Sequence, residues 1–186
     1  MSVMDVITTR RSIKNFTDRV ITKDEIEQML GAVCQAPNHR LTEPWRFYVL
    51  GPESREGYGR ALGMRKAKKV EDPEAAQAVI DKVGRSHRAL PGMIIVAITQ
   101  NENLEIREED FAAAWMGIQN LSLAAHDMGL GTHLKTGAIM DDPNGRTAVG
   151  VAEGERIVAV IEVGEPESMP EGRARCASGD WTTWVP

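Results

Sequence analysis

Two uninterrupted apolar runs constrain the fold more than any other feature of the sequence. The segments PGMIIVAITQ (91–100) and RIVAVIEVG (156–164) carry apolar residues at consecutive positions and are too short to cross a membrane. A strand with this pattern is typically covered on both of its faces. The chain is therefore expected to build a layered α/β domain around these two strands.

Helical patterns predict the elements that cover these two strands. Residues 22–36 begin with the Thr22 and Glu25 pair of a capping box, and Pro37 ends the helix. Their apolar stripe consists of Ile26, Met29, Leu30 and Val33. Residues 108–129 form an Ala-rich pattern and are predicted to be the core helix. Its inward side chains are expected to be Phe111, Trp115, Ile118, Leu121 and Leu123.

The remaining segments complete a single domain over residues 1–186. Val3, Met4 and Ile7 recur at helical spacing before Arg10. Further elements are predicted as a strand at 44–51, two helices within 54–88 separated near Asp72 and Pro73, a possible strand within 130–140, and a polar turn at 141–145. The tail, 165–186, carries Trp181 and Trp184, which is too much apolar surface to stay in water, so we expect it to pack on a partner subunit. The fold class is α+β, with a mixed or antiparallel sheet of four to five strands in α-β-α layers.

Charge and cysteine content exclude several classes of protein. The net charge is -5, from 22 Lys and Arg against 27 Asp and Glu, so a general affinity for nucleic acid or an anionic membrane is not expected. Cys34 and Cys176 are far apart and form no CxxC pair, which argues against a disulfide framework or a zinc site. No secretory signal pattern begins the chain, and a reducing cytoplasm is the expected compartment. Cys34 is predicted to lie on the inward half of its helix as inert packing.

A basic cluster follows the first helix. Arg10, Arg11, Ser12 and Lys14 place three cations and a hydroxyl within five residues. Guanidinium groups match phosphate oxygens in geometry, and each charge-assisted hydrogen bond contributes about 1.5 to 3 kcal/mol. The cluster is therefore a candidate site for a small anion. Taken alone, the cluster is better explained as a solvated helix end, and it needs further motifs to indicate a site.

Three ordered motifs resemble those of the nitroreductase family of flavoenzymes. The first, RRSxRxF in the family, is matched by Arg10, Arg11, Ser12, Lys14 and Phe16. The second, AP followed by QPWRF, is matched by Ala36, Pro37, Pro44, Trp45, Arg46 and Phe47. The third, GLGT followed by TG, is matched by Gly129, Leu130, Gly131, Thr132, Thr136 and Gly137. The resemblance covers nearly the whole chain and implies a nitroreductase-like fold.

The resemblance also implies a cofactor, a partner and a set of site residues. Nitroreductase-like proteins are homodimers that hold FMN between their subunits. By position, Arg10, Arg11 and Ser12 would contact the FMN phosphate and ribityl chain, and Lys14 would lie near the pyrimidine edge of the ring. Gln35 and His39 match positions that reach the cofactor from the neighbouring subunit. Leu134, Lys135 and Thr136 would offer backbone groups over the ring and one more cation for the phosphate end.

The implied activity is transfer of electrons from NADH or NADPH through flavin N5 to a nitroaromatic, a quinone or another small organic acceptor, with ping-pong kinetics. No catalytic side chain is assigned, because no triad or paired carboxylates are present. Two alternatives stay open: a flavin-binding protein without turnover, and a module that binds another phosphate ligand. Leu41 and Glu43 depart from the family motif, so the substrate is poorly predicted.

Several residues have simpler interpretations. His39 could be an exposed loop histidine, and Lys135 a solvated lysine. Trp45 and Trp115 are expected in the core. No role is assigned to the other histidines, which are His87, His126 and His133.

Overall fold

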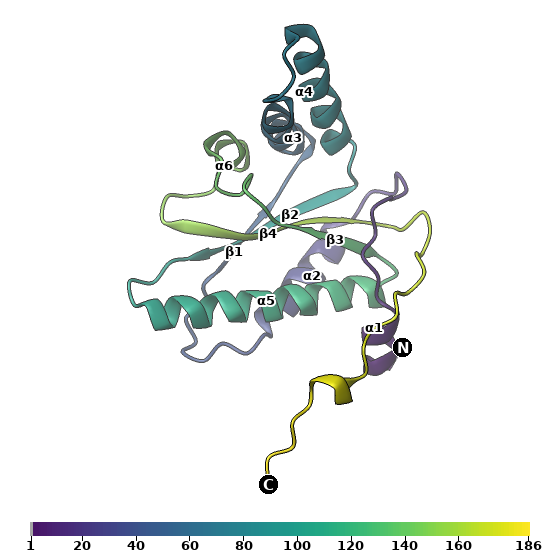
Figure 1. Ribbon diagram of the computed structural model, residues 1–186, viewed down its shortest axis with the longest axis vertical. Coiled ribbons are helices and arrows are strands. Elements are labelled where there is room, and N and C mark those ends of the chain that lie inside the picture. Colours follow the sequence, from purple (N-terminus) through teal and green to yellow (C-terminus); the bar gives the residue numbers. More distant parts are fainter. Residues whose placement is uncertain (1) are drawn as a thin grey trace.

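The computed structural model describes residues 2–186, and Met1 of the predicted domain 1–186 lies outside the described residues. Over this part of the chain, helices and strands are interspersed (Figure 1). The elements are α1 (Val3–Thr9), α2 (Lys23–Cys34), β1 (Trp45–Val49), α3 (Pro52–Ala67), α4 (Pro73–Arg88), β2 (Gly92–Thr99), α5 (Leu104–Asp127), β3 (Gly131–Lys135), α6 (Pro143–Val149), β4 (Glu155–Gly164) and the 3-10 helix η1 (Ser178–Trp181).

The strands form one antiparallel sheet in the order β1-β2-β4-β3. The central strands β2 and β4 pair along their whole length, with one irregularity between Val96 and Ala97. Residues 92–98 and 157–164 are buried without interruption. Both predicted central strands are confirmed, and the sheet has the lower of the two predicted strand numbers.

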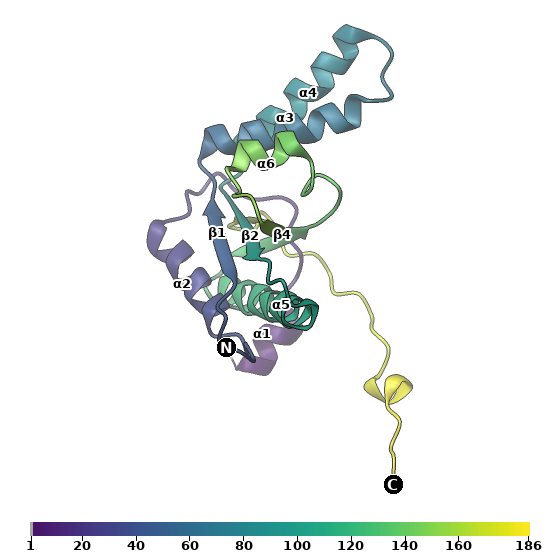
Figure 2. The same cartoon turned by 90° about the vertical axis from the view of Figure 1, so that its left-hand side faces the viewer.

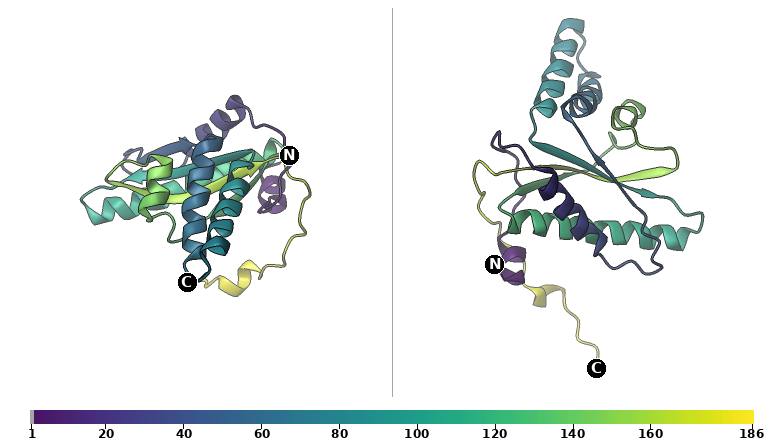
Figure 3. Two further views of the ribbon diagram at one scale, coloured as in Figure 1. Left: turned by 90° about the horizontal axis from the view of Figure 1, so that it is seen from above. Right: turned by 180° about the vertical axis from the view of Figure 1, so that it is seen from behind.

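Helices cover both faces of this sheet (Figure 1). On one face, α2 and α5 enclose a core that includes Met29, Ile118 and Leu121. On the other face, Tyr58 of α3 and Ile139 lie in a second core. The view from behind shows the same three layers (Figure 3, right). The predicted α-β-α arrangement is confirmed.

Capping residues set the first residue of α2 and of α5, the two helices that cover the first face of the sheet. Thr22 Oγ1 accepts a hydrogen bond from Glu25 N, and the Glu25 carboxylate accepts one from Thr22 N, as the capping box predicts. Helix α5 begins at Leu104, four residues before the predicted start, because the Asn103 side chain caps it. Of the two tryptophans expected in the core, Trp45 is buried and Trp115 is partly buried against the core.

The prediction of a polar turn at 141–145 is wrong, because the chain forms helix α6 there. The Asp142 side chain caps this helix by accepting a hydrogen bond from Asn144 N at 3.0 Å. Pro143 occupies the first helical position, where its missing N–H removes no hydrogen bond. Arg65 of α3 pairs with the Asp142 carboxylate at 3.0 Å and holds the pKa of that carboxyl below its usual value.

Two parts of the chain project from the layered body (Figure 2). Helices α3 and α4 pack against each other as a hairpin, separated at residues 68–72 as the sequence predicts. The tail leaves β4 and extends away from the body of the subunit (Figure 2). Trp181 and Trp184 in the tail are 78% and 90% exposed. The tail thus makes little use of its own subunit to cover its apolar side chains.

A close backbone contact joins the segment after α1 to strand β3. Ile13 N donates to the carbonyl oxygen of Thr132 at 3.0 Å, and Ser12 forms an isolated bridge with Thr132. A Cβ at position 131 would stand 2.3 Å from Ile13 Cγ1, well inside van der Waals contact. Only glycine at position 131 lets the buried Ile13 side chain lie against the strand.

We predict that Gly131→Ala lowers the free energy of unfolding by about 2 kcal/mol, because the added methyl group overpacks the contact with Ile13. Urea denaturation measures this change. The matched control is Gly31→Ala in α2, where a Cβ meets nothing within 4 Å. This control should raise stability by about 0.5–1 kcal/mol. Equal effects of the two substitutions would contradict the proposed close contact.

Candidate functional site

The basic cluster lies on the extended segment 10–14. Successive side chains of such a segment point to opposite sides, so burial of one directs its neighbours outward. Ile13 is 2% exposed and anchors the segment, while its neighbours Ser12 and Lys14 are exposed. Arg10 ends helix α1 with extended backbone angles, so the chain leaves the helix directly into this segment. Alternation therefore turns the side chains of Ser12 and Lys14 away from the face that buries Ile13.

Arg11 is fixed by the backbone around it. Its Nη1 donates to the carbonyl oxygens of Thr8 at 2.8 Å and Arg10 at 2.9 Å. Gly172 of the tail packs on the same guanidinium, because a Cβ there would stand 2.4 Å from Nη2. The Arg11 Nε is buried and has no hydrogen-bond partner within residues 2–186. The guanidinium thus keeps an unsatisfied donor beside the cluster.

A cavity of about 1010 Å³ opens between this segment and the tail. Its lining contains five cationic side chains and one carboxylate, that of Glu171. The cations are Arg10, Arg11, Lys14, Arg173 and Arg175. The hydroxyl groups of Ser12 and Ser168 belong to the same lining. This set of donors suits an anionic ligand, and a phosphate monoester in particular.

The cations of the cavity are not neutralised by the described part of the chain. None of the five forms an ion pair with a carboxylate among residues 2–186. Burial lowers the pKa of Arg10, and the charges of Arg11 and Arg175 lower it further. Arginine remains charged at neutral pH despite such a shift. The lowered pKa reflects an electrostatic cost that a bound anion would relieve.

Arg173 and Arg175 were missed by the sequence analysis. They lie about 160 residues from the first cluster, and only the path of the tail brings the two together. The signal was the pair of arginines in GRAR (172–175) within a segment rich in Pro and Gly. Such a pair indicates a local cation site but not its location.

The third motif lies at the end of β3 and outside the cavity lining. Lys135 Nζ donates to the Glu162 carboxylate of β4, and His133 Nδ1 lies 3.1 Å from the other oxygen of that group. The Glu162 side chain is 5% exposed, so this carboxylate is partnered in the interior. Leu134 packs against the core and Thr136 is exposed. Lys135 is therefore directed to Glu162 and not to the basic cluster.

Gln35 and His39 also lie outside the cavity lining of their own subunit, and both are exposed. Gln35 caps the end of α2. His39 lies in the loop 38–43, where its Nδ1 is 3.0 Å from the Glu109 carboxylate of α5. The structure thus brings four of the nine predicted cofactor residues together. The assignment of all nine to a cofactor stays a prediction.

The histidines without an assigned role have local partners. His87 is buried, with Nδ1 2.8 Å from the Val83 carbonyl oxygen, and burial lowers its pKa. His126 Nε2 lies 2.8 Å from Thr9 Oγ1, and burial together with Arg10 and Arg11 lowers its pKa. The His126 contact joins α5 to α1, whereas the His87 contact lies within α4.

The prediction that Cys34 lies on the inward half of α2 is wrong, because Cys34 is exposed. It is the last residue of the helix, one position beyond the buried Val33 and therefore turned away from the core. Partial burial and then Glu43 raise the pKa of its thiol, which disfavours the thiolate. Cys176 is also an exposed free thiol.

No group of three or more His, Cys, Asp or Glu side chains is placed to hold a metal ion within residues 2–186. None of the described helices combines the length and the apolar character needed to span a membrane.

Comparisons with known proteins agree with this fold. The family model described as "Nitroreductase family" matches residues 7–165. A Bacillus subtilis protein named "Putative NAD(P)H nitroreductase YfhC" is 34% identical over 172 residues, which cover 92% of this chain and 88% of that protein. The crystal structure of a nitroreductase-like family protein from Bacillus cereus superposes with a TM-score of 0.84 at 28% identity, covering 100% of this chain and 96% of that one.

A further solved structure, a nitroreductase from Bacteroides fragilis with bound FMN, has a TM-score of 0.76 at 19% identity and full coverage of both chains. At this identity the likeness concerns the fold alone. The α+β architecture is that of a nitroreductase-like protein. The chain belongs to the nitroreductase family, and the resemblance inferred from the three motifs is confirmed.

We predict that inorganic phosphate stabilises the ligand-free protein more than sodium chloride of equal ionic strength, because an anion offsets the unpaired cations of the cavity. At ten times its Kd, the gain is about 1.4 kcal/mol. Thermal melts in the two salts measure the difference. Arg10→Ala should reduce it, and an equal response of both proteins would argue against an anion site.

Proposed function

We propose that the protein is an FMN-dependent oxidoreductase that passes electrons from NADH or NADPH to a small organic acceptor. The observation that carries this proposal is the cavity of about 1010 Å³ with its excess of unpaired cations. Family membership supports the choice of FMN as the anion. Both cysteines are free thiols, in keeping with a cytoplasmic location.

The phosphate end of FMN fits the donors of the cavity. A phosphate monoester carries about -1.5 to -2 charges at neutral pH, and Arg10, Arg11 and Ser12 offer it guanidinium and hydroxyl donors. The buried Arg11 Nε without a partner is the kind of donor that a cofactor oxygen satisfies. Arg173 and Arg175 of the tail add two cations to the same end.

The ring end is assigned to residues on the other side of the cluster. Lys14 is exposed and lies two positions from Ser12, so its ammonium can reach beyond the phosphate toward the pyrimidine edge. The segment Leu134, Lys135 and Thr136 supplies backbone groups from the end of β3. Gln35 and His39 lie outside the lining of their own cavity and are assigned to the cofactor of the partner subunit.

The residues of the site bind and orient, and they need no acid-base chemistry of their own. When bound, FMN supplies hydride acceptance and donation at N5. The cations around its phosphate fix the position of the ring, and Lys14 stabilises negative charge at the pyrimidine edge. A nicotinamide and an acceptor that use one cleft in turn give ping-pong kinetics. The acceptor is a nitroaromatic, a quinone or a similar small molecule.

A homodimer is part of this proposal, because apolar side chains of the subunit lack cover. In α1 only Val6 is buried, whereas Val3, Met4 and Ile7 are 73%, 63% and 45% exposed. Trp181 and Trp184 of the tail are exposed as well. A second copy of the chain would cover both sets and would bring its own Gln35 and His39 toward the cavity.

We predict that the protein binds FMN in solution and that NADH or NADPH reduces the bound flavin without oxygen. Visible absorption during an anaerobic titration measures bleaching, and addition of a quinone should restore the colour. Arg10→Ala should weaken FMN binding by at least about 2 kcal/mol, or about 30-fold, because a charge-assisted hydrogen bond is lost.

The control for this substitution is Arg60→Ala on α3, which removes a surface ion pair with Asp81 far from the cavity lining. It should leave FMN affinity unchanged. A protein that binds FMN but is never reduced would favour flavin binding without turnover. A protein that stays colourless with FMN would favour another phosphate ligand.

We predict that the protein sediments as a dimer and that Trp181→Ala with Trp184→Ala weakens this association by about 30-fold, since buried tryptophans are frequent hot spots of about 2 kcal/mol or more. Analytical ultracentrifugation over a concentration series measures the change. The control is Met64→Ala, an exposed apolar residue of the α3 hairpin. Equal effects of the two variants would contradict a role of the tail.

A further inference from the structure

The loop 38–43 is held in a costly backbone conformation. Leu41 and Glu43 have φ values of 50° and 44°, in the left-handed region that non-glycine residues seldom adopt. Each such residue costs on the order of 1–3 kcal/mol unless its surroundings enforce it. Leu41 is 82% exposed, so its own side chain makes no packing contact that explains the conformation.

Three carboxylates of α5 enforce this conformation. Asp110 is buried and accepts a hydrogen bond from Thr42 Oγ1. Glu105 and Glu109 pair with Arg40, at 3.2 Å to Nη2 and 3.0 Å to Nε. The loop is therefore fastened to the helix on either side of Leu41. This rigid attachment holds the adjacent His39 at a fixed place.

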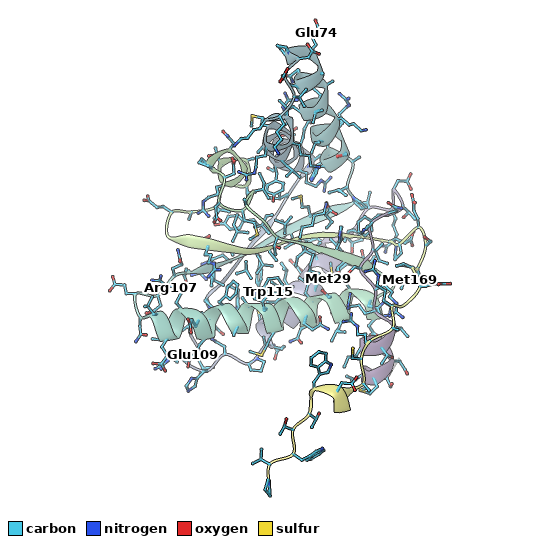
Figure 4. All side chains as sticks on the ribbon, in the orientation of Figure 1. Met29, Glu74, Arg107, Glu109, Trp115 and Met169 are labelled. Atoms are coloured by element: carbon cyan, nitrogen blue, oxygen red, sulfur yellow. The ribbon has the colours of Figure 1, made fainter. Side chains whose placement is uncertain are left out.

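Glu109 makes a second contact that the other carboxylates do not make. Its Oε1 lies 3.0 Å from His39 Nδ1, while its Oε2 receives Arg40 Nε. Glu109 lies on the side of α5 opposite to Trp115, which points toward the sheet (Figure 4). The contact thus forms on the outer side of the layered body, where His39 is exposed.

The chemistry of this contact fixes the proton on the imidazole. The hydrogen bonds from His39 and then Arg40 lower the pKa of Glu109, so the carboxylate is ionised at neutral pH and only accepts. His39 Nδ1 must therefore carry the hydrogen. In the neutral ring, Nε2 is left as a hydrogen-bond acceptor that faces away from α5.

We propose that Glu109 is a positioning residue that orients His39 and fixes its tautomer, so that Nε2 is presented to a donor group of the FMN held by the partner subunit. This inference rests on the proposed function, which places His39 at the partner's cofactor. Glu109 itself lies outside the cavity lining, on α5, and acts on the cofactor only through His39. The strained loop supplies the rigidity that such an orientation needs.

The tautomer is tested first, without any cofactor. Long-range ¹H–¹⁵N spectra of the labelled protein report which imidazole nitrogen carries hydrogen, and His39→Ala identifies the resonances. We expect the Nδ1–H form in the wild type and a mixed or inverted form in Glu109→Ala. Glu105→Ala removes a carboxylate that contacts only Arg40, and it should leave the His39 signals unchanged.

Affinity for FMN is tested second, by quenching of flavin fluorescence. We expect Glu109→Ala and His39→Ala each to weaken FMN binding by about fivefold to tenfold, and the double variant to weaken it no further. Arg40→Gln breaks both arginine pairs but keeps the His39 contact, so it should have a smaller effect. Thermal melts confirm that all variants fold.

Four results would overturn the inference. Wild-type affinity in His39→Ala would show that His39 does not reach the cofactor, while FMN binding itself stands. Additive losses in the double variant, or a full loss in Arg40→Gln, would show that Glu109 acts by fastening the loop alone. A wild-type chain that binds no FMN would instead refute the proposed function, and this role of the pair with it.

Discussion

The central pair of strands, β2 and β4, is buried on both faces, and this burial decides where functional groups can lie. A buried backbone must satisfy its hydrogen bonds, which the antiparallel ladder does, and its apolar side chains need a helical layer on each side. Glu162 is the polar exception near one end of β4, and it is buried with Lys135 and His133 as partners. Ligand groups are thereby confined to the rim of the sheet.

The outer strand β3 provides that rim. Its free edge is partly covered by the extended segment after α1, through the bond from Ile13 N to Thr132 and the bridge at Ser12. Because side chains of an extended segment alternate, burying Ile13 turns Ser12 and Lys14 outward. One contact thus closes the edge of the sheet and also orients the cation cluster. Gly131 is the sequence feature that permits this contact.

Much of this architecture can be predicted from local sequence signals. Apolar runs gave the central strands, and capping residues gave the start of α2. Asp142 and Pro143 equally signal the start of helix α6, but this helix is short and was not predicted. The prediction placed Cys34 on the wrong side of α2, because this last residue of the helix lies beyond the row of buried positions that ends at Val33. The signals that succeed are those that act within a few residues of the chain.

Contacts between distant segments could not be predicted in this way. The convergence of Arg173 and Arg175 on Arg10 depends on the path of the tail, and a basic pair says nothing of that path. The pairing of Lys135 with Glu162 depends on the register of β3 on β4, which places His133 opposite Glu162. A slip of one residue would turn these side chains to the other face. Lone cations in a sequence therefore do not reveal whether the fold neutralises them.

Charge pairing separates the parts of the site that must stay fixed from the part that admits a ligand. His39 and Arg40 are each matched by a carboxylate of α5, and Lys135 is matched by Glu162. The cations of the cavity are not matched in this way by the described chain. Burial first, and then the charges of Arg11 and Arg175, lower the pKa of Arg10, so its charged form is disfavoured there. The fold thus pairs the charges of its loops with carboxylates but leaves the cations of one cavity without such partners. The positive charge of that cavity stays unbalanced until an anion binds.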